Sequence, residues 1–356
     1  MARIDAFLDV LLARNGTDLH LAVGSSPMIR ARGELVSIRV KEIDRQEIEA
    51  LLLEILTPAQ KRRIAEELDL ELTHAHGEKA RFRASYFHKA SGLAAVFRIM
   101  PTAVLSLAEL GCPDAIRGLA ERRAGLCLVT GPARSGKSTT LAAMIAHINQ
   151  TRACTITTIE DPIEIVHKSI KAQITQREIG AHAASFAGAI RSAAREDAEV
   201  ILVGDLRAAE AMKLALQLAS SGVLVLGAVP ASSAAAALDG ILRAFPPEQQ
   251  AEIRGMLAEN LLGVVAQRLL RTADSKGRVA AHEILLGGGA LAAIIREGTT
   301  FQVPSLMQHE ESAGMQTMDM ALERLVARGA ITVEAGLEKA IDKEGFPRGS
   351  RAEAPG

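Results

Sequence analysis

The chain has 356 residues, of which 48% are hydrophobic and 23% are charged, with 41 Lys and Arg against 42 Asp and Glu. This length predicts two or three domains with real cores. The near-zero net charge argues against a nucleic-acid binder that works through a bulk positive field, and 3% aromatic residues argue against base stacking. Three cysteines cannot form a four-thiolate zinc site or a disulfide framework, so we expect a cytoplasmic protein without zinc or nucleic acid.

The first hundred residues combine helical and alternating patterns. Helices are expected over 4–14 and in two stretches of 44–67, and strands over 18–23, 69–75, 80–88 and 92–99. The second of the two helical stretches opens at Thr57, an N-cap residue followed by proline at the first helical position. We therefore expect an α+β domain over 1–100 and a linker over 101–112.

After the linker, short apolar β runs alternate with helical stretches. The β runs lie at 125–131, 154–160, 199–205 and 222–228. This alternation is typical of a parallel sheet with crossover helices, which predicts an α/β domain over 113–289. From about 247 onward the sequence favours helix apart from a strand at 278–285, so a helical extension is expected over 290–345 and a disordered tail over 346–356.

Residues 214–238 carry no charge over 25 positions, long enough to span a bilayer. Gly222, Gly227 and Pro230 divide this stretch into short pieces. It fits better as a helix end, a buried strand, a loop and the start of the next helix. Near the N-terminus, Asp5 and Asp9 interrupt the apolar pattern, which argues against a signal peptide.

One motif carries a specific chemistry. The phosphate-loop pattern G-x4-G-K-S consists of Gly131, Pro132, Ala133, Arg134, Ser135, Gly136, Lys137 and Ser138, followed by Thr139. It follows an apolar strand and opens a helix, so backbone N–H groups and the helix N-terminus would face phosphate. Lys137 would bridge the β- and γ-phosphates of ATP and Ser138 would ligate Mg²⁺. The alternative is a chance glycine-rich turn.

A phosphate loop needs acidic partners for the metal and the attacking water. Asp205 ends an apolar strand, which favours a metal ligand over its alternative role as a helix N-cap. Glu160, Asp161 and Glu164 follow another strand, where α/β sheets place their ligands. A solvated acidic turn explains these three carboxylates equally well. Glu160 is a candidate metal ligand and Glu164 a candidate for polarising water.

Several segments, together with the phosphate loop, carry a resemblance that runs over nearly the whole chain. They are TDLHL (17–21), PMIR (27–30), ARFR (80–83), AVFR (95–98), TIEDPIEIVH (158–167), QRE (176–178), REDAEVILVG (195–204), AAHEI (280–284) and GMQTMD (314–319). The chain resembles the secretion ATPases of type II secretion and type IV pili, above all the twitching-motility retraction branch, which lacks the tetracysteine zinc module.

The resemblance implies fold class, partners and activity. It implies an α/β chain with a PAS-like α+β N-terminal domain, then a RecA-like P-loop ATPase domain with a helical C-terminal extension. It also implies a homohexamer that hydrolyses Mg-ATP to drive pilus retraction, associated peripherally with the inner-membrane platform protein of the pilus. Arg81, Arg83 and Arg98 match the arginines that stabilise the γ-phosphate in this family, where the nucleotide lies between the two domains. Their alternative role is simply to face water on alternate strand positions.

The departures from the family pattern are selective. Asp205 replaces a glutamate, Pro230 replaces the histidine of the histidine box, and Val223 replaces a second histidine. Arg134 stands where glycine is usual, and the family's Ala-Ile-Arg-Asn-Leu motif is weakened at 290–294. Two readings follow: a retraction ATPase of reduced activity, or an ATP-binding accessory subunit beside an active paralogous retraction ATPase. An unrelated P-loop enzyme such as a helicase is disfavoured by the neutral charge.

Overall fold

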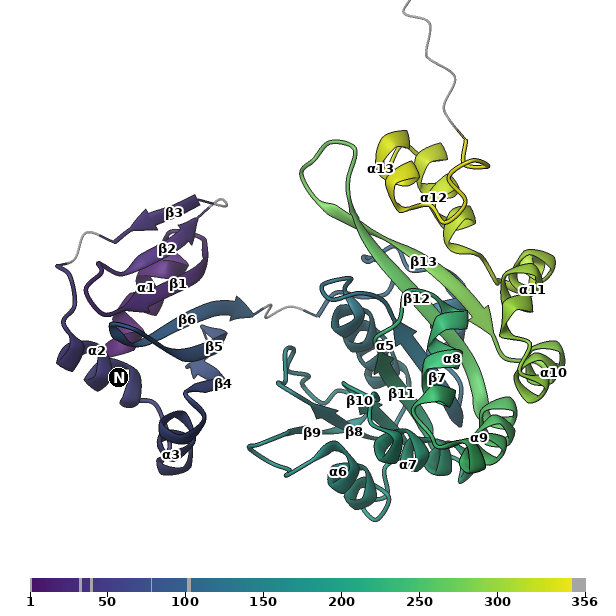
Figure 1. Cartoon of the computed structure of the whole chain (residues 1–356), viewed down its shortest axis with the longest axis horizontal. Coiled ribbons are helices and arrows are strands. Elements are labelled where there is room, and N and C mark those ends of the chain that lie inside the picture. Colours follow the sequence, from purple (N-terminus) through teal and green to yellow (C-terminus); the bar gives the residue numbers. More distant parts are fainter. Residues whose placement is uncertain (1, 32–33, 39–40, 78, 101–103, 348–356) are drawn as a thin grey trace, which may run out of the picture. The chain divides into compact units, whose positions relative to one another are not determined.

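The structure is a computed structural model that describes residues 2–31, 34–38, 41–77, 79–100 and 104–347 (Figure 1). Contacts divide the chain into two compact units. The first unit is Met1–Ala103 with Pro162–Val166, and the second is Val104–Asp161 with His167–Gly356. Of the linker expected over 101–112, residues 101–103 lie outside the described residues.

Within its described residues, the first unit holds a six-stranded antiparallel sheet in the order β3-β2-β1-β6-β5-β4. Its elements are α1 (Arg3–Ala13), β1 (Gly16–Ala22), β2 (Met28–Ala31), β3 (Glu34–Ser37), α2 (Arg45–Leu53), α3 (Pro58–Glu67), β4 (Asp69–His76), β5 (Ala80–Lys89) and β6 (Gly92–Met100). The helices and strands that the pattern predicts here are confirmed. β2 and β3 are not predicted by the pattern, because strands of four residues are too short to show alternation.

The two faces of this sheet differ in chemistry. Ile4 of α1, Leu19 of β1 and Phe97 of β6 are fully buried in one apolar cluster. Because successive strand residues point to opposite faces, Asp18 and Arg98 lie on the other face. The arginines singled out from the sequence therefore belong to a polar face that the helices of this unit do not use for their core.

The second unit is built on a sheet in the order β13-β12-β7-β11-β10-β8-β9. Its elements are α4 (Asp114–Ala120), β7 (Gly125–Thr130), α5 (Lys137–Thr151), β8 (Thr155–Glu160), β9 (Gln173–Glu178), α6 (Phe186–Ala193), β10 (Val200–Val203), α7 (Ala209–Ser220), β11 (Leu224–Val229), α8 (Ala234–Arg243), α9 (Pro247–Asn260), β12 (Leu261–Arg271), β13 (Arg278–Leu286), α10 (Gly289–Glu297), α11 (Val303–His309), α12 (Met318–Ala327) and α13 (Val333–Lys339). The ladders from β12 to β9 are parallel, and β13 pairs antiparallel with β12. The four β runs and the parallel sheet predicted from the sequence are confirmed.

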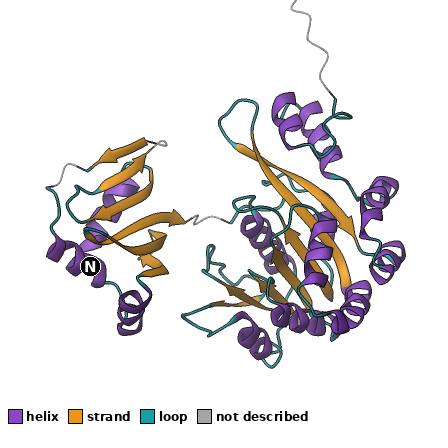
Figure 2. Cartoon of the chain, in the orientation of Figure 1, coloured by secondary structure: helices purple, strands orange, loops and turns teal. Residues whose placement is uncertain are grey.

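Helices cover both faces of this sheet (Figure 2). Leu126 and Ile201 pack with α6, α7, α8 and α9 on one face. Their chain neighbours Cys127 and Val200 pack with α4 and α5 on the other face. Strands buried on both faces read as continuous apolar runs, which explains the sequence pattern.

The uncharged stretch 214–238 is divided as expected. It contains the end of α7, all of β11 and the first half of α8. Over the described parts of the chain, every helix is too short or too polar to cross a membrane.

Two predictions about the C-terminal third are wrong. Leu261–Arg271 is a strand, β12, and not a helix. An apolar run of 11 residues also fits a helix, and a strand buried on both faces shows no alternation that would identify it. Phe346, expected in the tail, is 3% exposed in a cluster formed by α12, α13 and the β12–β13 hairpin. Residues 348–356 of the expected tail lie outside the described residues.

The buried imidazole of His282 on β13 is expected to make the free energy of unfolding depend on pH. It is 2% exposed, and its Nε2 atom has no hydrogen-bond partner among the described residues. Burial lowers the pKa of His282 from 6.5 to about 4. The unfolded state therefore binds more protons between these values, and stability is lost as pH falls through this range. We expect His282 to cost about 3 kcal/mol of unfolding free energy between pH 7 and pH 4.

Urea unfolding of the wild-type protein and of His282→Asn at several pH values measures this loss of unfolding free energy. The adjacent Glu283 is also buried, and burial raises its pKa, so its contribution has the opposite sign and is lost as pH rises. Glu283 is present in both proteins, so the difference between their pH profiles isolates the imidazole. His309→Asn alters an exposed ring and serves as the control. A wild-type profile retained by His282→Asn would contradict the prediction.

Candidate nucleotide site

The segments predicted to carry the chemistry meet at one edge of the second sheet. The parallel ladders align Thr130 of β7 with Val229 of β11, and Val203 of β10 with both Gly227 of β11 and Ile159 of β8. Glu160 ends β8, and the phosphate loop, the Pro230 segment and Asp205 follow strand ends at this same edge. Parallel α/β sheets bind their ligands at the carboxyl ends of the strands.

The phosphate loop curls tightly between β7 and α5. Gly131 and Gly136 have φ angles of 149° and 93°, which favour glycine. A Cβ atom on Gly131 would lie 2.4 Å from the carbonyl oxygen of Gln267, so this position also leaves no room for a side chain. Arg134 has a φ of 64°, in the left-handed region that costs a non-glycine residue about 1 kcal/mol. The glycine usual at this position would avoid that cost.

Lys137 is the first residue of α5 and turns back over the loop. Its Nζ atom donates to the carbonyl oxygens of Gly131 at 2.8 Å and Pro132 at 2.9 Å. Ser138 is exposed and Thr139 half-buried in the same first turn. The helix N-terminus, with the backbone N–H groups of its first turn, and an ammonium group thus converge on the loop, an arrangement that suits an anion.

Gln267 of β12 is hydrogen-bonded to the phosphate loop. This residue was not identified from the sequence. Its amide Nε2 donates to the carbonyl of Ser135 at 2.8 Å, and its Oε1 accepts from the hydroxyl of Thr140 at 2.8 Å. The side chain is 3% exposed. Because Gln267 lies on the strand wrongly predicted as a helix, no sequence signal placed it beside a loop 132 residues away.

Gln267→Leu is expected to destabilise the second unit by about 2–6 kcal/mol and to weaken nucleotide binding. Leucine has a similar volume but leaves the Ser135 carbonyl and the Thr140 hydroxyl buried without partners, at about 1–3 kcal/mol each. Urea unfolding and titration with a fluorescent ADP analogue measure the two effects. In a Thr140→Val background the substitution should cost less, because one partner is already gone. If the losses of unfolding free energy in the two single variants add up fully in the double variant, the hydrogen bond between Thr140 and Gln267 does not contribute to stability.

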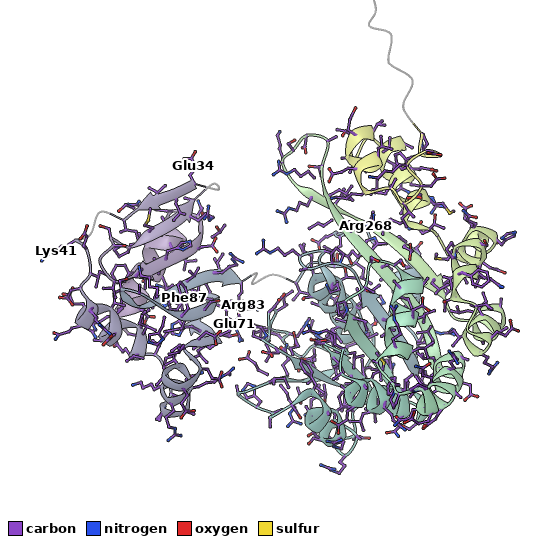
Figure 3. The ribbon with its side chains drawn as sticks, viewed as in Figure 1. Glu34, Lys41, Glu71, Arg83, Phe87 and Arg268 are labelled. Carbon is purple, nitrogen blue, oxygen red and sulfur yellow. The ribbon has the colours of Figure 1, made fainter. Side chains whose placement is uncertain are left out.

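A cavity of about 530 Å³ adjoins the loop. The loop residues from Gly131 to Ser135 line one side, with Pro230 and Ala231 beside them. Arg268 of β12, which Figure 3 labels, and Lys339 of α13 are among the other lining residues. The guanidinium of Arg268 donates to the carbonyl of Lys339. Pro230, at the histidine-box position, brings neither an imidazole nor a backbone N–H to this cavity.

Asp205 follows β10 and is held by its neighbour Arg207. Its Oδ1 atom accepts from the backbone N–H of Arg207 at 3.0 Å, and Oδ2 lies 2.5 Å from a guanidinium nitrogen of Arg207. The hydrogen bonds and charge of Asp205 raise the pKa of Arg207. The alternative role as a helix N-cap does not apply, because the N-cap position of α7 is Ala208.

The acidic cluster is split by the fold. The Oε1 atom of Glu160 accepts from the Thr158 hydroxyl at 2.6 Å and the Gln176 amide at 3.2 Å, at the end of β8. Glu164 belongs to the Pro162–Val166 segment of the first unit, where its carboxylate lies 3.8 Å from Arg83. Asp161 is exposed. These three carboxylates are therefore not simply one solvated turn.

The three arginines share the polar face of the first sheet. Arg81 and Arg83 lie on β5, and Arg83 is directly opposite Arg98 of β6. Arg83 forms two hydrogen bonds with Glu71, one of them 2.8 Å long, so the two side chains lie together (Figure 3). Arg98 donates to Asp18. Arg83 and Arg98 are therefore both ion-paired, and Arg98 also keeps an exposed outer end.

The donor set at the loop fits a magnesium ion that arrives with a nucleotide. Among the described residues, no group of three or more His, Cys, Asp or Glu side chains could hold a metal by itself. The Ser138 hydroxyl and the Asp205 carboxylate are oxygen ligands of the kind Mg²⁺ prefers. Mg²⁺ often takes only one or two protein ligands and completes its shell with phosphates and water.

Comparisons with known proteins agree with this geometry. A family model for "type II/IV secretion system protein" matches residues 4–336. The chain is 44% identical over 319 residues to a twitching motility protein of Neisseria gonorrhoeae, covering 90% of this chain and 85% of that protein. It is 42% identical over 333 residues to the type IV pilus retraction ATPase PilT of Pseudomonas aeruginosa, covering 94% of this chain and 96% of that protein.

A solved structure gives the same result for the fold. The crystal structure of the pilus retraction motor PilT with bound ADP matches with a TM-score of 0.89 at 36% identity, covering 96% of this chain and 98% of that one. The α/β architecture with two sheets is thus shared along nearly the whole length. The chain belongs to the type II/IV secretion system protein family, within its branch of pilus retraction ATPases.

Proposed function

We propose that this chain is an ATPase of the type IV pilus machinery that drives pilus retraction by Mg-ATP hydrolysis, with reduced turnover. The observation that carries the proposal is the phosphate loop, with Lys137 at the start of α5, at the same sheet edge as Asp205 and Glu160. Relatives named for twitching motility and pilus retraction support the assignment to this process.

The roles of the loop and its acids follow from their chemistry. The ammonium of Lys137 exchanges two loop carbonyls for the β- and γ-phosphates, and backbone N–H groups between Ala133 and Thr139 hold the phosphate oxygens. Ser138 and Asp205 hold Mg²⁺, with Glu160 as a further acid at the same edge. The metal neutralises charge on the phosphates when bound.

Glu164 and the arginines complete the proposed catalytic group. Glu164 polarises the attacking water, and Arg81, Arg83 and Arg98 offset charge that develops on the transferring phosphoryl group. Arg83 and Arg98 have different carboxylate partners before a nucleotide binds. Arg83 lies beside both Glu71 and Glu164, whereas Arg98 is bonded to Asp18.

The finer architecture is part of the same proposal. We assign a PAS-like domain to 1–100 and a RecA-like domain to 113–289, followed by a helical extension over 290–345. The strand order, in which β11 separates the phosphate-loop strand β7 from the Asp205 strand β10, supports the RecA-like assignment. We further propose a homohexamer in the cytoplasm that associates with the inner-membrane platform protein of the pilus.

Two observations favour a second candidate, an ATP-binding accessory subunit beside an active paralogue. Pro230 lines the cavity at the loop where the family carries histidine. Asp205 is one methylene shorter than the family glutamate and is paired with Arg207. Both features retain nucleotide binding and remove groups that would act on the γ-phosphate or on water.

A restored enzyme tests the cause of the reduced turnover. Asp205→Glu together with Pro230→His is expected to raise kcat for ATP hydrolysis on the order of tenfold, about 1.4 kcal/mol of barrier. Steady-state phosphate release from the assembled protein measures this change. Ser232→His, at a neighbouring cavity residue, is the control and should not raise kcat. An unchanged rate in the restored enzyme would show that these two positions do not limit turnover.

Complementation separates the two candidate functions. The chain is expressed in piliated cells that lack every retraction ATPase, and in cells that keep one active retraction ATPase. A motor restores twitching in the first strain, whereas an accessory subunit increases twitching only in the second. Purified protein is assayed in parallel for ADP formation with Mg²⁺ and with excess EDTA. No hydrolysis and no effect in either strain would reject both candidates.

A further inference from the structure

One buried carboxylate lies at the centre of the polar face of the first sheet. Asp18 of β1 is 3% exposed and stands directly opposite Arg98 of β6 and Arg30 of β2. Its Oδ1 atom accepts from Nε of Arg98 at 2.6 Å. Its Oδ2 atom accepts from the Thr17 hydroxyl at 2.7 Å and lies 3.9 Å from Nε of Arg30.

These partners keep Asp18 ionised in spite of its burial. Burial alone would raise the pKa of this carboxyl group, but the Thr17 hydroxyl and the Arg98 guanidinium together hold the pKa below its usual value. Only the carboxylate of this pair is buried, and the cost of removing its water offsets much of the attraction to the exposed guanidinium. Stability is therefore a weak explanation for a carboxylate at this position.

The geometry has a specific effect on Arg98. The bond to Asp18 uses the Nε–H group, which fixes the plane of the guanidinium at its inner end. The side chain is 57% exposed, and across the described residues its outer nitrogens make no other hydrogen bond. Arg83 differs, because Glu71 binds two of its nitrogens. The Nε end of the Arg98 guanidinium is therefore held by Asp18, while its outer N–H donors face away from the sheet.

We propose that Asp18 is a positioning residue that holds the guanidinium of Arg98 ready for the transferring phosphoryl group. The inference rests on the role given to Arg98 in the proposed function. A donor that is already oriented loses no freedom when charge develops in the transition state, so its stabilising effect is realised in kcat. Asp18 itself touches neither nucleotide nor water in this role.

A double-mutant cycle tests the assignment in the full-length protein. Asp18→Asn, which keeps the size of the side chain, should lower kcat on the order of tenfold while KM for ATP stays within about twofold. In an Arg98→Gln background the same substitution should change kcat less than about twofold. Effects that multiply across the two positions, or an unchanged kcat in Asp18→Asn, would overturn the proposal.

A binding measurement supports the cycle without relying on turnover. Asp18→Asn should weaken binding of ADP with aluminium fluoride, a transition-state mimic, on the order of tenfold and leave ADP binding unchanged. Equal weakening of both ligands would indicate a structural role and overturn the proposal. Arg30→Gln is the matched control, because it removes the other cation at the same carboxylate and should leave both affinities unchanged.

Two further outcomes are distinguishable. If Arg98→Gln alone leaves kcat and the aluminium fluoride complex unchanged, the role of Arg98 in the proposed function fails, whatever Asp18 does. If Asp18→Asn does not fold, Thr17→Val removes one hydrogen bond from the same carboxylate at an exposed position. That variant should lower kcat about twofold to threefold at constant KM, and an unchanged kcat would overturn the proposal.

Discussion

Lys137→Ala is expected to lower kcat for ATP hydrolysis on the order of 100- to 1000-fold and to weaken nucleotide binding. The ammonium group is the cation at the start of α5, and it is bonded to two carbonyl oxygens of the phosphate loop. Alanine removes the charge that would pass to the β- and γ-phosphates and leaves the backbone of the loop in place. The loss should therefore be larger for hydrolysis than for binding of ADP.

Steady-state phosphate release and titration with a fluorescent ADP analogue measure the two effects. Lys276→Ala, in the exposed turn between β12 and β13, removes one positive charge from the second unit and is the matched control. Circular dichroism and size-exclusion chromatography establish that fold and assembly are kept. Hydrolysis by Lys137→Ala at the wild-type rate would place the ATPase activity outside this loop.

The parts of the site that follow local rules could be predicted from the sequence. The phosphate loop is a contiguous motif between a strand and a helix, and Gly131 and Gly136 have the positive φ angles that such a turn requires. Asp205 and Glu160 could be placed at the sheet edge because parallel strands bring their carboxyl ends together. Periodicity was sufficient for these elements.

The parts that depend on pairing between distant segments could not be predicted. Gln267 supports the loop only because β12 pairs with β7, and the apolar run of β12 does not distinguish a strand from a helix. Asp18 and Arg98 lie 80 residues apart and meet through the register of β1 on β6. Composition and spacing along the chain carry no record of that register.

The pairing of Asp205 with Arg207 bears directly on the proposed metal role. The guanidinium occupies both carboxylate oxygens and is 70% exposed, so the ion pair is worth no more than about 1 kcal/mol. A metal bound with nucleotide can therefore displace it. Asp205→Asn is expected to lower kcat on the order of 100-fold and to raise the Mg²⁺ concentration needed for half-maximal hydrolysis.

Arg207→Gln provides the opposite change at the same carboxylate. Without the competing guanidinium, half-maximal hydrolysis should need about threefold less Mg²⁺, which corresponds to the weak ion pair. Magnesium titrations at saturating ATP measure both variants. A carboxylate that served only to hold the backbone N–H of residue 207 would lose that bond in Asp205→Asn and keep it in Arg207→Gln, and neither variant would change the Mg²⁺ requirement. Shifts in opposite directions are expected only if Asp205 exchanges Arg207 for the metal.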